Sequence, residues 1–345
     1  MSAAAGSFAG HGGRLCVAQA LYPHAPAPWI DLSTGINPEP YPDVRASAVA
    51  RSRLPTPSET RGLEIAAGRA FGVGDADAHR VAAAAGSEAV LRLMPYALRV
   101  ETAIVVGPTY SSHAAAWRAA RAPVTEVCGA AASVSRASVS PHVLTVVNPN
   151  NPDGAVVDRE ALLRLHDDLA SQGGYLVVDE AFADVEPGCS VAALAGVARY
   201  PRLIVLRSFG KFYGLAGVRL GFVIAAGPIV ARFRELLGDW PVSADAIAIG
   251  LAAYADDAWA EHTRERLRRS ANRLDDLLIS SRFEVVGGTT LFRLARSADA
   301  RTRFDKLLRA GILARPFDHD PALLRFGLPH EQWAWQRLAE ALRTP

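Results

Sequence analysis

Lysine is rare in this chain, and one lysine lies in a glycine-rich segment. Of the 37 basic side chains among 345 residues, only Lys211 and Lys306 are lysines; the others are arginines. Only a primary amine condenses with an aldehyde to give an imine, and arginine keeps its proton at ordinary pH. A lysine retained within a motif therefore points to covalent chemistry with a carbonyl compound, although chance retention would also explain a lone lysine.

The segment around Lys211 also carries groups that bind phosphate. Ser208 lies three residues before the lysine and Arg219 eight residues after it, in Ser-Phe-Gly-Lys-Phe-Tyr-Gly-Leu-Ala-Gly-Val-Arg. Glycines let the main chain approach a ligand closely, and arginine binds phosphate through two parallel N–H groups. The alternative is a turn whose polar groups are merely solvated.

Two further polar segments follow apolar runs that are typical of buried strands. Asp179 ends the first run, and a carboxylate buried there needs a cationic or hydrogen-bonding partner. Ligands of open α/β sheets bind at this carboxyl edge. Asn151 follows the second run in a dense Asn/Pro/Gly turn and precedes a proline, which favours an extended backbone that aims its amide into the same cleft. The alternatives are a helix-capping aspartate and a plain turn.

Weaker signals follow two other apolar runs. Gly86, Ser87 and Glu88 stand where a run gives way to a helix-like pattern, and the N-terminus of a helix suits an anion. Tyr110 follows the next run and offers an aromatic ring for stacking. Taken alone, the first is consistent with any capped helix and the second with a surface tyrosine.

The elements that position these residues are predicted by the spacing of the apolar runs. Short runs at 82–85, 103–106, 143–147, 175–178, 203–206 and 221–225 alternate with helix-like stretches. This pattern predicts a doubly wound α/β domain with a mostly parallel sheet, over residues 46–235. Residues 1–45 form an arm rich in Gly and Pro that we expect to contribute to the small domain and the active site. We expect residues 236–345 to form a smaller α+β domain, with strands near 283–294 and 323–328.

Composition excludes several classes of protein. The net charge is +2 with no block of like charges, which argues against nucleic-acid or polybasic membrane partners. Half of the residues are apolar and 21% are charged, as in an ordinary globular protein. No apolar run is long enough to span a bilayer, and no secretory signal is recognisable. The cysteines form no Cys-x-x-Cys pair, so we expect no disulfide, no metal site and a cytoplasmic setting. They are Cys16, Cys128 and Cys189.

Taken in order, these segments resemble the fold-type I pyridoxal 5′-phosphate (PLP) enzymes of the aspartate aminotransferase superfamily. The order is a Gly-Ser helix start, a tyrosine after a strand, Asn-Pro-x-Gly, a strand ending in Asp-Glu-Ala, and Ser-x-x-Lys with an arginine eight residues on. The resemblance covers nearly the whole chain. It implies a large doubly wound domain, a smaller α+β C-terminal domain, and PLP as cofactor.

The resemblance also implies roles for the matching residues. Lys211 would bond to the cofactor aldehyde and then shuttle a proton, and Asp179 would pair with the protonated pyridine nitrogen. Asn151 would donate to the 3′ oxygen of the cofactor, and Tyr110 would stack on its ring. Arg325 would grip the α-carboxylate of the substrate. The cofactor phosphate would be held at the helix start after Gly86, through the backbone amides of Ser87 and Glu88 and the side chains of Ser208 and Arg219.

Two branches of the superfamily compete. Histidinol-phosphate aminotransferases share this length and these motifs. The N-terminal arm, with His11-Gly-Gly and Asp-Leu-Ser-Thr-Gly35-Ile-Asn37-Pro, resembles that of threonine-phosphate decarboxylases of cobalamin (vitamin B12) synthesis. That branch implies decarboxylation of L-threonine O-3-phosphate to (R)-1-amino-2-propanol O-2-phosphate and CO₂, with His11, Gly35 and Asn37 lining the substrate pocket. A non-catalytic binding or regulatory protein that keeps the PLP fold is the third alternative.

Two positions depart from the usual superfamily pattern. Phe182 stands where many relatives have a tyrosine that reaches the cofactor's 3′ oxygen, and loss of that donor should shift the pKa of the lysine–cofactor adduct. Leu54 stands where many relatives have a tyrosine that reaches the cofactor phosphate of a neighbouring subunit. We expect a homodimer, and this second departure puts its usual cross-subunit phosphate contact in doubt.

Overall fold

The computed structural model describes Phe8 and residues 12–128 and 142–343. The chain folds into two compact units. The large unit comprises Tyr41–Asn151 and Ala155–Trp259, and the small unit comprises Met1–Pro40, Pro152–Gly154 and Ala260–Pro345.

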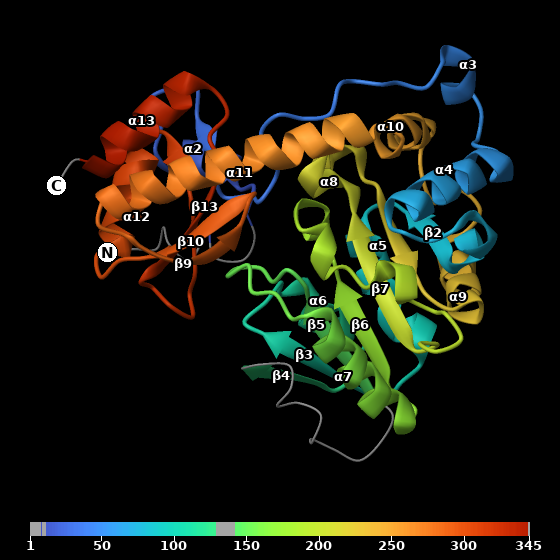
Figure 1. Cartoon of the computed structure of the whole chain (residues 1–345). Helices are drawn as coiled ribbons and strands as arrows, with labels where there is room; N and C mark the ends of the chain where they lie inside the picture. Colours follow the sequence, from blue (N-terminus) through green and yellow to red (C-terminus); the bar gives the residue numbers. More distant parts are fainter. Residues whose placement is uncertain (1–7, 9–11, 129–141, 344–345) are drawn as a thin grey trace. The chain divides into compact units, whose positions relative to one another are not determined.

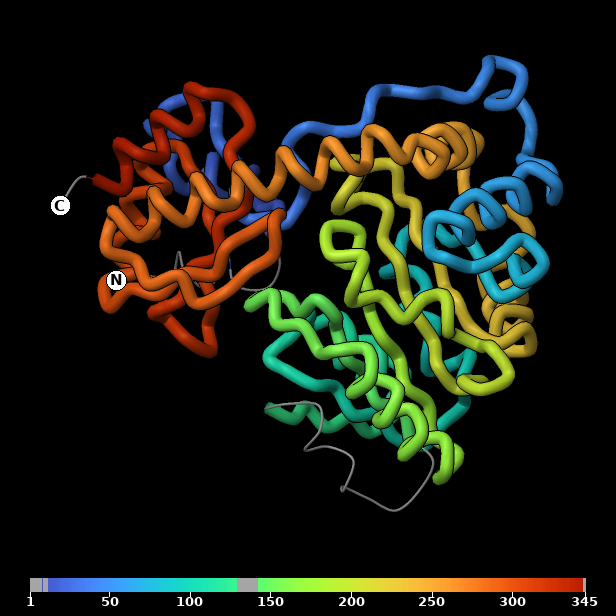
Figure 2. The backbone as a smooth tube through the Cα atoms, viewed as in Figure 1, coloured from blue at the N-terminus to red at the C-terminus, as the bar shows by residue number. Residues whose placement is uncertain are grey.

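A seven-stranded sheet forms the centre of the large unit (Figures 1 and 2). Its strands are β2 (Val81–Ala84), β3 (Thr102–Gly107), β4 (Val124–Cys128), β5 (His142–Val147), β6 (Tyr175–Asp179), β7 (Leu203–Ser208) and β8 (Gly221–Ile224). Their order across the sheet is β2-β8-β7-β6-β5-β3-β4. Only β8 runs antiparallel to its neighbours, β2 and β7. Val147 pairs with Asp179 and Asp179 with Leu206, so the carboxyl ends of β5, β6 and β7 lie side by side.

Helices connect these strands and cover the sheet. They are α3 (Ala48–Arg51), α4 (Pro57–Ala70), α5 (Ser87–Leu98), α6 (Ser112–Ala119), α7 (Arg159–Ser171), α8 (Phe209–Phe212), α9 (Gly227–Leu237) and α10 (Ala244–Tyr254). Apolar side chains of α5, α6 and α9 form one core with the strands, including Leu91, Trp117 and Phe233. The short apolar strands are buried because helices cover them, as expected for a parallel sheet.

The small unit holds two short sheets. Strand β1 (Ile30–Asp31) pairs in parallel with β11 (Ile312–Leu313). A second, antiparallel sheet has the order β12-β13-β10-β9 and comprises β9 (Glu284–Thr289), β10 (Phe292–Arg296), β12 (Arg315–Pro316) and β13 (Leu323–Gly327). The helices of this unit are α2 (Leu15–Leu21), α12 (Ala300–Arg309) and α13 (Gln332–Arg343).

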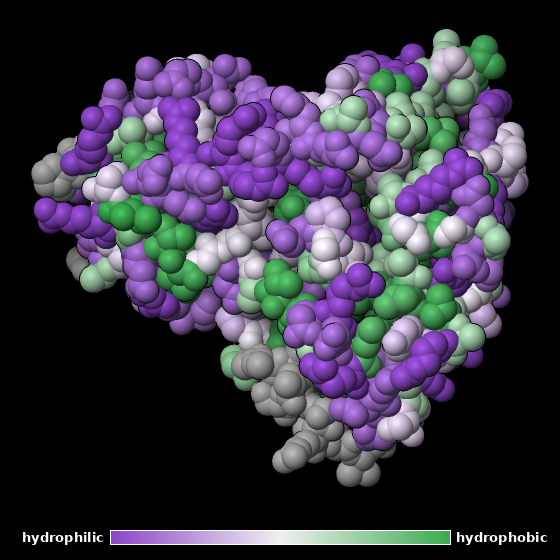
Figure 3. Space-filling model, viewed as in Figure 1, coloured by the Kyte–Doolittle hydropathy of each residue, from purple (hydrophilic) through white to green (hydrophobic). Residues whose placement is uncertain are grey.

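One long helix, α11 (Asp257–Ser280), begins in the last residues of the large unit and continues into the small one. Its apolar positions Leu267, Leu274 and Leu278 are fully buried. Hydrophilic side chains line its visible side (Figure 3). This one-sided pattern is typical of a helix that covers a core.

The observed fold confirms the predicted α/β class, with a large mostly parallel sheet and a smaller α+β unit. The unit boundary differs from the predicted one, because residues 236–259 lie in the large unit. The reason is the close packing of α10 on α4: a Cβ on Gly250 would lie 2.6 Å from the Leu63 side chain. Among the residues described, no helix has the length and apolar character needed to cross a membrane.

Candidate active site

Three segments of the large unit meet at the first turn of α5. Gly86 precedes this helix with φ +87°, and a Cβ placed there would lie 2.7 Å from Nη2 of Arg219. A Cβ on Gly221 would lie 2.3 Å from the backbone nitrogen of Ser87. Gly221 in turn pairs with Ser208 across β7 and β8. The two glycines therefore allow the Arg219 guanidinium and strand β8 to lie close to the N-terminus of α5. The guanidinium and the backbone N–H groups at this helix start together make an anion-binding cradle.

Arg219 itself has an unusual backbone conformation. Its φ of +57° and ψ of +59° lie in the left-handed region, which few residues other than glycine adopt. Its Nη1 donates to the carbonyl oxygen of Ala216 at 3.3 Å. Strained conformations of this kind persist where the surroundings hold them and often mark functional sites.

Asp179 ends β6, and each oxygen of its carboxylate has a hydrogen-bond partner. Its Oδ2 lies 2.8 Å from Nε2 of His113, and its Oδ1 accepts from the Ala181 N–H at 3.0 Å. Both side chains are at most 5% exposed. A carboxylate in its ionised form only accepts hydrogen bonds, so the His113 tautomer that suits this contact is the one with its hydrogen on Nε2. The sequence predicted that this carboxylate needs a partner, and the structure identifies His113 of α6 as that partner.

Tyr110 packs against the same histidine. Its ring meets the His113 ring edge to face, with centroids 6.1 Å apart. Its hydroxyl donates to Oε2 of Glu88 at 3.2 Å, and Glu88 also accepts from Arg92 at 2.8 Å. Burial raises the pKa of Tyr110, so the phenol stays a hydrogen-bond donor. Glu88, which the sequence singled out for its backbone amide, thus also holds Tyr110 through its side chain.

The Asn/Pro/Gly turn after β5 is anchored to its neighbours. The backbone N–H of Asn148 donates to the carbonyl oxygen of Asp179 at 2.8 Å. Thr109 donates its hydroxyl to Oδ1 of Asn150 at 2.6 Å, which joins this turn to the loop after β3. Asn151 is 8% exposed, within the same turn. The structure therefore brings Asn151 to the edge where β3, β5 and β6 end.

Lys211 lies in α8, the short helix that follows β7 directly. Its Nζ lies 5.8 Å from the centroid of the Phe182 ring, a distance at which an ammonium is attracted to an aromatic face. Phe182 is 4% exposed and follows β6, the strand that ends in Asp179. An apolar ring thus borders the amine at the position where the sequence departs from the tyrosine of many relatives.

This donor set fits PLP. A phosphate dianion, an aldehyde and a pyridine nitrogen need an anion cradle, a primary amine and a buried carboxylate. The large unit supplies each of them: the α5 N-terminus with Arg219, the Lys211 amine, and the carboxylate of Asp179. No group of metal-ligating side chains occurs among the residues that the structure covers.

The small unit contains a pair of buried arginines. Arg325 of β13 lies opposite Arg315 of β12 in the antiparallel register, and both are at most 8% exposed. Nη2 of Arg325 donates to the carbonyl oxygen of Ser33 at 2.7 Å. Burial and the like charge of Arg315 lower the pKa of Arg325 well below its usual value. The sequence identified Arg325 but missed Arg315, whose register against β13 is set only by the fold.

The N-terminal arm lies against the same strand. The N–H of Gly327, at the end of β13, donates to the carbonyl oxygen of Leu32 at 2.7 Å, and the N–H of Gly13 donates to Oγ of Ser33 at 2.8 Å. Gly35 follows in this segment and is buried. The structure thus brings the arm together with Arg325.

Asn37 belongs to the same segment and is 2% exposed. Its Oδ1 accepts from the Glu39 N–H at 3.0 Å and from Nη2 of Arg266 at 3.4 Å. Through these contacts Asn37 stabilises the conformation of the arm around Glu39. His11, which the sequence also singled out, lies outside the described residues.

A family model for class I and II aminotransferases matches residues 61–342, most of the chain. The chain belongs to this family. The match includes both the cradle at α5 and the arginine pair of the small unit.

Relatives of this aminotransferase-family chain include two threonine-phosphate decarboxylases. One, from Pseudomonas aeruginosa, is 42% identical, and the alignment covers 96% of each chain. Another, from Sinorhizobium sp, is 38% identical over 96% of this chain and 97% of the relative. Among solved structures, a histidinol-phosphate aminotransferase from Sinorhizobium meliloti in complex with PLP aligns with a TM-score of 0.82 at 20% identity, covering 95% of this chain and 94% of that one. At that identity the likeness concerns the fold alone.

Proposed function

We propose that this protein is a PLP-dependent decarboxylase of L-threonine O-3-phosphate, which releases CO₂ and (R)-1-amino-2-propanol O-2-phosphate for cobalamin synthesis. The observation that carries the proposal is the 42% identity to a threonine-phosphate decarboxylase over 96% of both chains. The site geometry supports it, because the large unit offers a PLP donor set and the small unit offers buried cations for an anionic substrate.

The large unit would hold the cofactor. The α5 N-terminus after Gly86, with the Ser87 and Glu88 amides, would bind the phosphate. Ser208 and Arg219 would complete that contact. PLP supplies an electron sink for the bond that breaks at Cα of the substrate.

Other residues of the large unit would orient the cofactor ring. Asp179, fixed by His113, would hold the pyridine nitrogen in its protonated form. Tyr110 would stack on the ring in the orientation that Glu88 sets. Asn151 would donate to the 3′ oxygen.

Lys211 would have two tasks. Its primary amine would hold the cofactor covalently before substrate arrives. When the bond between Cα and the carboxylate breaks and CO₂ leaves, the same amine would deliver the proton that Cα needs. No other lysine of the described chain lies in the large unit, since Lys306 belongs to α12.

The substrate carries two anionic groups, a carboxylate and a phosphate. Arg325 would bind the carboxylate, and Arg315 beside it would add a second positive charge for the anions. A bound anion offsets the burial and charge repulsion that lower the pKa of Arg325. Gly35, Asn37 and His11 of the arm would complete the substrate contacts.

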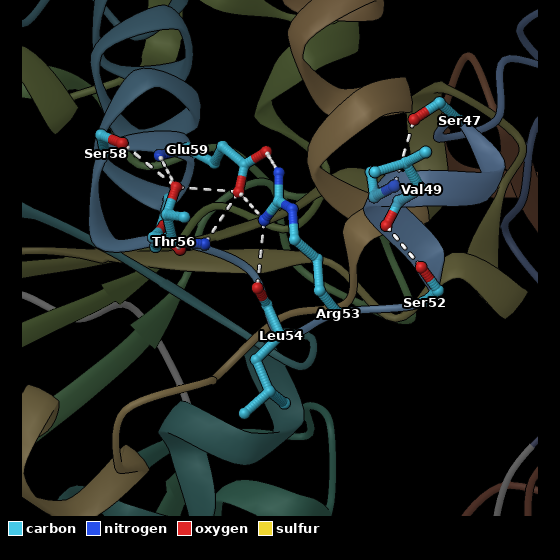
Figure 4. A network of polar contacts seen from close by, with 10 residues as sticks. Ser47, Val49, Ser52, Arg53, Leu54, Thr56, Ser58 and Glu59 are labelled. Carbon is cyan, nitrogen blue, oxygen red and sulfur yellow. Dashed lines mark hydrogen bonds and ion pairs between the residues drawn. The ribbon is translucent and has the colours of Figure 1, made fainter.

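We further propose that the enzyme is a homodimer in the cytoplasm. Leu54 and Val49 are 58% and 71% exposed, and α3 and α4 flank Leu54 (Figure 4). Exposed apolar side chains close together on one segment would suit contact with a second copy. Arg53 fixes the segment by donating to Oε1 and Oε2 of Glu59 at 2.6 and 2.8 Å. The proposal for the compartment rests on the cysteine pattern of the sequence, which contains no Cys-x-x-Cys pair.

The decisive experiment omits any oxo acid. PLP-loaded protein is incubated with carboxyl-labelled L-threonine O-3-phosphate, and trapped CO₂ and phosphorylated amine are quantified, with Lys211→Ala as control. We expect one CO₂ per amine. If CO₂ is absent but imidazole-acetol phosphate is transaminated with glutamate, the protein is an aminotransferase. If PLP binds and neither reaction occurs, the decarboxylase proposal is wrong and the non-catalytic alternative gains support.

A further inference from the structure

A second set of charged side chains lies on the opposite side of β6 and β7 from Asp179 and Ser208. Arg207 precedes Ser208 in β7, and Glu180 follows Asp179 at the end of β6. Successive side chains of a strand point to opposite faces. The pairing of the strands continues through this point, because the Glu180 N–H donates to the carbonyl oxygen of Leu206 at 2.9 Å. Arg207 and Glu180 therefore share the face that Asp179 and Ser208 do not occupy.

These side chains are joined in one buried network. Nη1 of Arg207 donates to Oε2 of Glu180 at 2.9 Å, and Nη2 pairs with Asp184. Glu180 also accepts from the Ser190 hydroxyl at 2.5 Å and from the Val191 N–H at 2.6 Å. Glu180 is fully buried and Arg207 is 4% exposed. One guanidinium thus bridges two carboxylates, a geometry that suits the planar fork of arginine.

Aromatic rings enclose this network. The Phe71 ring lies 4.5 Å from the centre of the Arg207 guanidinium, and Phe222 and Tyr254 pack edge to face against Phe71. Burial raises the pKa of Glu180 despite the opposing charge of Arg207. Electrostatic interactions are strong in such an apolar setting, so displacing one member affects the others.

Stability alone does not account for a buried network of this kind. Removing two charges from water is costly, and well-packed apolar side chains are often at least as stabilising as a buried ion pair. The better-attested use of such a pair is to fix one arrangement of the chain. Here the arrangement it fixes is the end of β6 relative to β7, one residue away from Asp179 and Ser208.

We propose that Arg207, Glu180 and Asp184 are positioning residues for the cofactor site. By joining the ends of β6 and β7 from behind, they set the spacing between Asp179, which holds the pyridine nitrogen, and the Ser208–Lys211 segment. The inference rests on the proposed PLP site but not on the choice of substrate. It can therefore fail while the decarboxylase assignment stands, and the reverse also holds.

The test compares Arg207→Met with a matched variant, Arg80→Met. Arg80 is also 4% exposed, and it donates to the carbonyl oxygen of Ala195 at 2.6 Å and to Asp77 at 3.0 Å, away from the site residues. For each purified protein, the dissociation constant of PLP and the pH midpoint of the bound cofactor's visible absorbance are measured. We expect Arg207→Met to weaken PLP binding at least about tenfold and to move the midpoint by at least about 0.5 pH unit. Arg80→Met should leave the PLP dissociation constant and the pH midpoint unchanged within error. This should hold even if its thermal unfolding midpoint falls as far as that of Arg207→Met.

Two milder variants guard against misfolding of Arg207→Met. Arg207→Lys keeps the charge but reaches only one carboxylate, and Glu180→Gln keeps the shape but removes one charge. Both should weaken PLP binding, and by less than Arg207→Met does. If the variants that fold bind PLP like the wild type and keep its pH midpoint, the network serves stability alone and the proposal is wrong.

Discussion

The amine of Lys211 can be tested apart from the rest of the site. Lys211→Ala removes the one primary amine that a side chain provides in the described part of the large unit, so we expect the visible absorbance of the lysine–cofactor adduct to disappear and turnover to fall at least about 10³-fold. Lys306→Ala, the change at the other lysine, is the matched control and should keep both. Absorbance spectroscopy and CO₂ release check the prediction. Full activity of Lys211→Ala would remove this residue from the mechanism.

Asp179 should affect the rate far more than cofactor binding. Asp179→Ala leaves the phosphate cradle and Lys211 in place but removes the buried carboxylate that we propose pairs with the pyridine nitrogen. We expect PLP to stay bound in part while kcat falls about 10³-fold. Single-turnover kinetics on fully loaded protein separate the two effects. Near-normal turnover would exclude Asp179 as the partner of the ring.

His113 should act through Asp179 and not directly on the substrate. His113→Phe removes the donor at 2.8 Å and leaves a buried carboxylate short of a partner, so PLP binding should weaken about tenfold. His166→Phe is the control, since His166 is also buried but hydrogen-bonds to Asp167 on α7. Fluorescence titration with PLP gives both constants. An equal loss of PLP affinity in the two variants would indicate that the changes destabilise the protein in general.

Two residues of the candidate site, His113 and Arg315, were not predicted from the sequence. Both are single side chains whose partners come from other elements, so neither belongs to a local motif. A signal for His113 was nevertheless available: it lies three residues after Tyr110, about one helical turn, in a segment that begins a helix. Arg315 has no such signal, because its neighbour Arg325 follows only from the register of β12 against β13.

At the level of elements, α4 has a complete N-terminal cap. The Thr56 hydroxyl accepts from the Glu59 N–H at 3.3 Å, and the Glu59 carboxylate accepts from the Thr56 N–H at 2.8 Å (Figure 4). Thr56→Ala removes one half of this box and should lower the free energy of unfolding by about 1 kcal/mol. Urea unfolding measures the change, with Ser171→Ala as control, because Ser171 is exposed at the end of α7 and takes no part in this cap. An unchanged stability would mean that the cap is replaced by water.

The same cap should be sensitive to acid. Its contacts, the pairing with Arg53 foremost, lower the pKa of Glu59 from 4.5 to about 2 in the folded protein. A lowered pKa stabilises the fold above the unfolded pKa, and this contribution is lost as the pH falls from about 4.5 towards about 2. Glu59→Gln should therefore destabilise the protein at pH 7 and differ progressively less from wild type below pH 4.5. Thermal unfolding across this pH range checks it; a difference independent of pH would contradict it.

The elements that the sequence predicted share one property: each carries its own local signal. All six apolar runs became strands of the large sheet, and the strands predicted near 283–294 and 323–328 are β9, β10 and β13. Strand β4 was missed because it is an edge strand with polar, exposed positions. Strands β1, β11 and β12 are two residues long and exist only through their partners, so no periodicity marks them.

At the level of the whole molecule, the proposed tasks separate by unit: cofactor binding depends on residues of the large unit, and recognition of the substrate carboxylate on Arg325 of the small unit. Arg325→Met keeps the buried volume and should leave PLP absorbance unchanged, because no proposed cofactor ligand lies in the small unit. It should raise KM for L-threonine O-3-phosphate by about 10–100-fold, the effect of losing a charge-assisted hydrogen bond. Arg296→Met is the control, because Arg296 lies on β10 of the same sheet and pairs with Asp320 at 3.0 Å on the surface. If Arg325→Met instead lost PLP and kept its KM, this division of tasks between the two units would be wrong, and Arg325 would belong to the cofactor site.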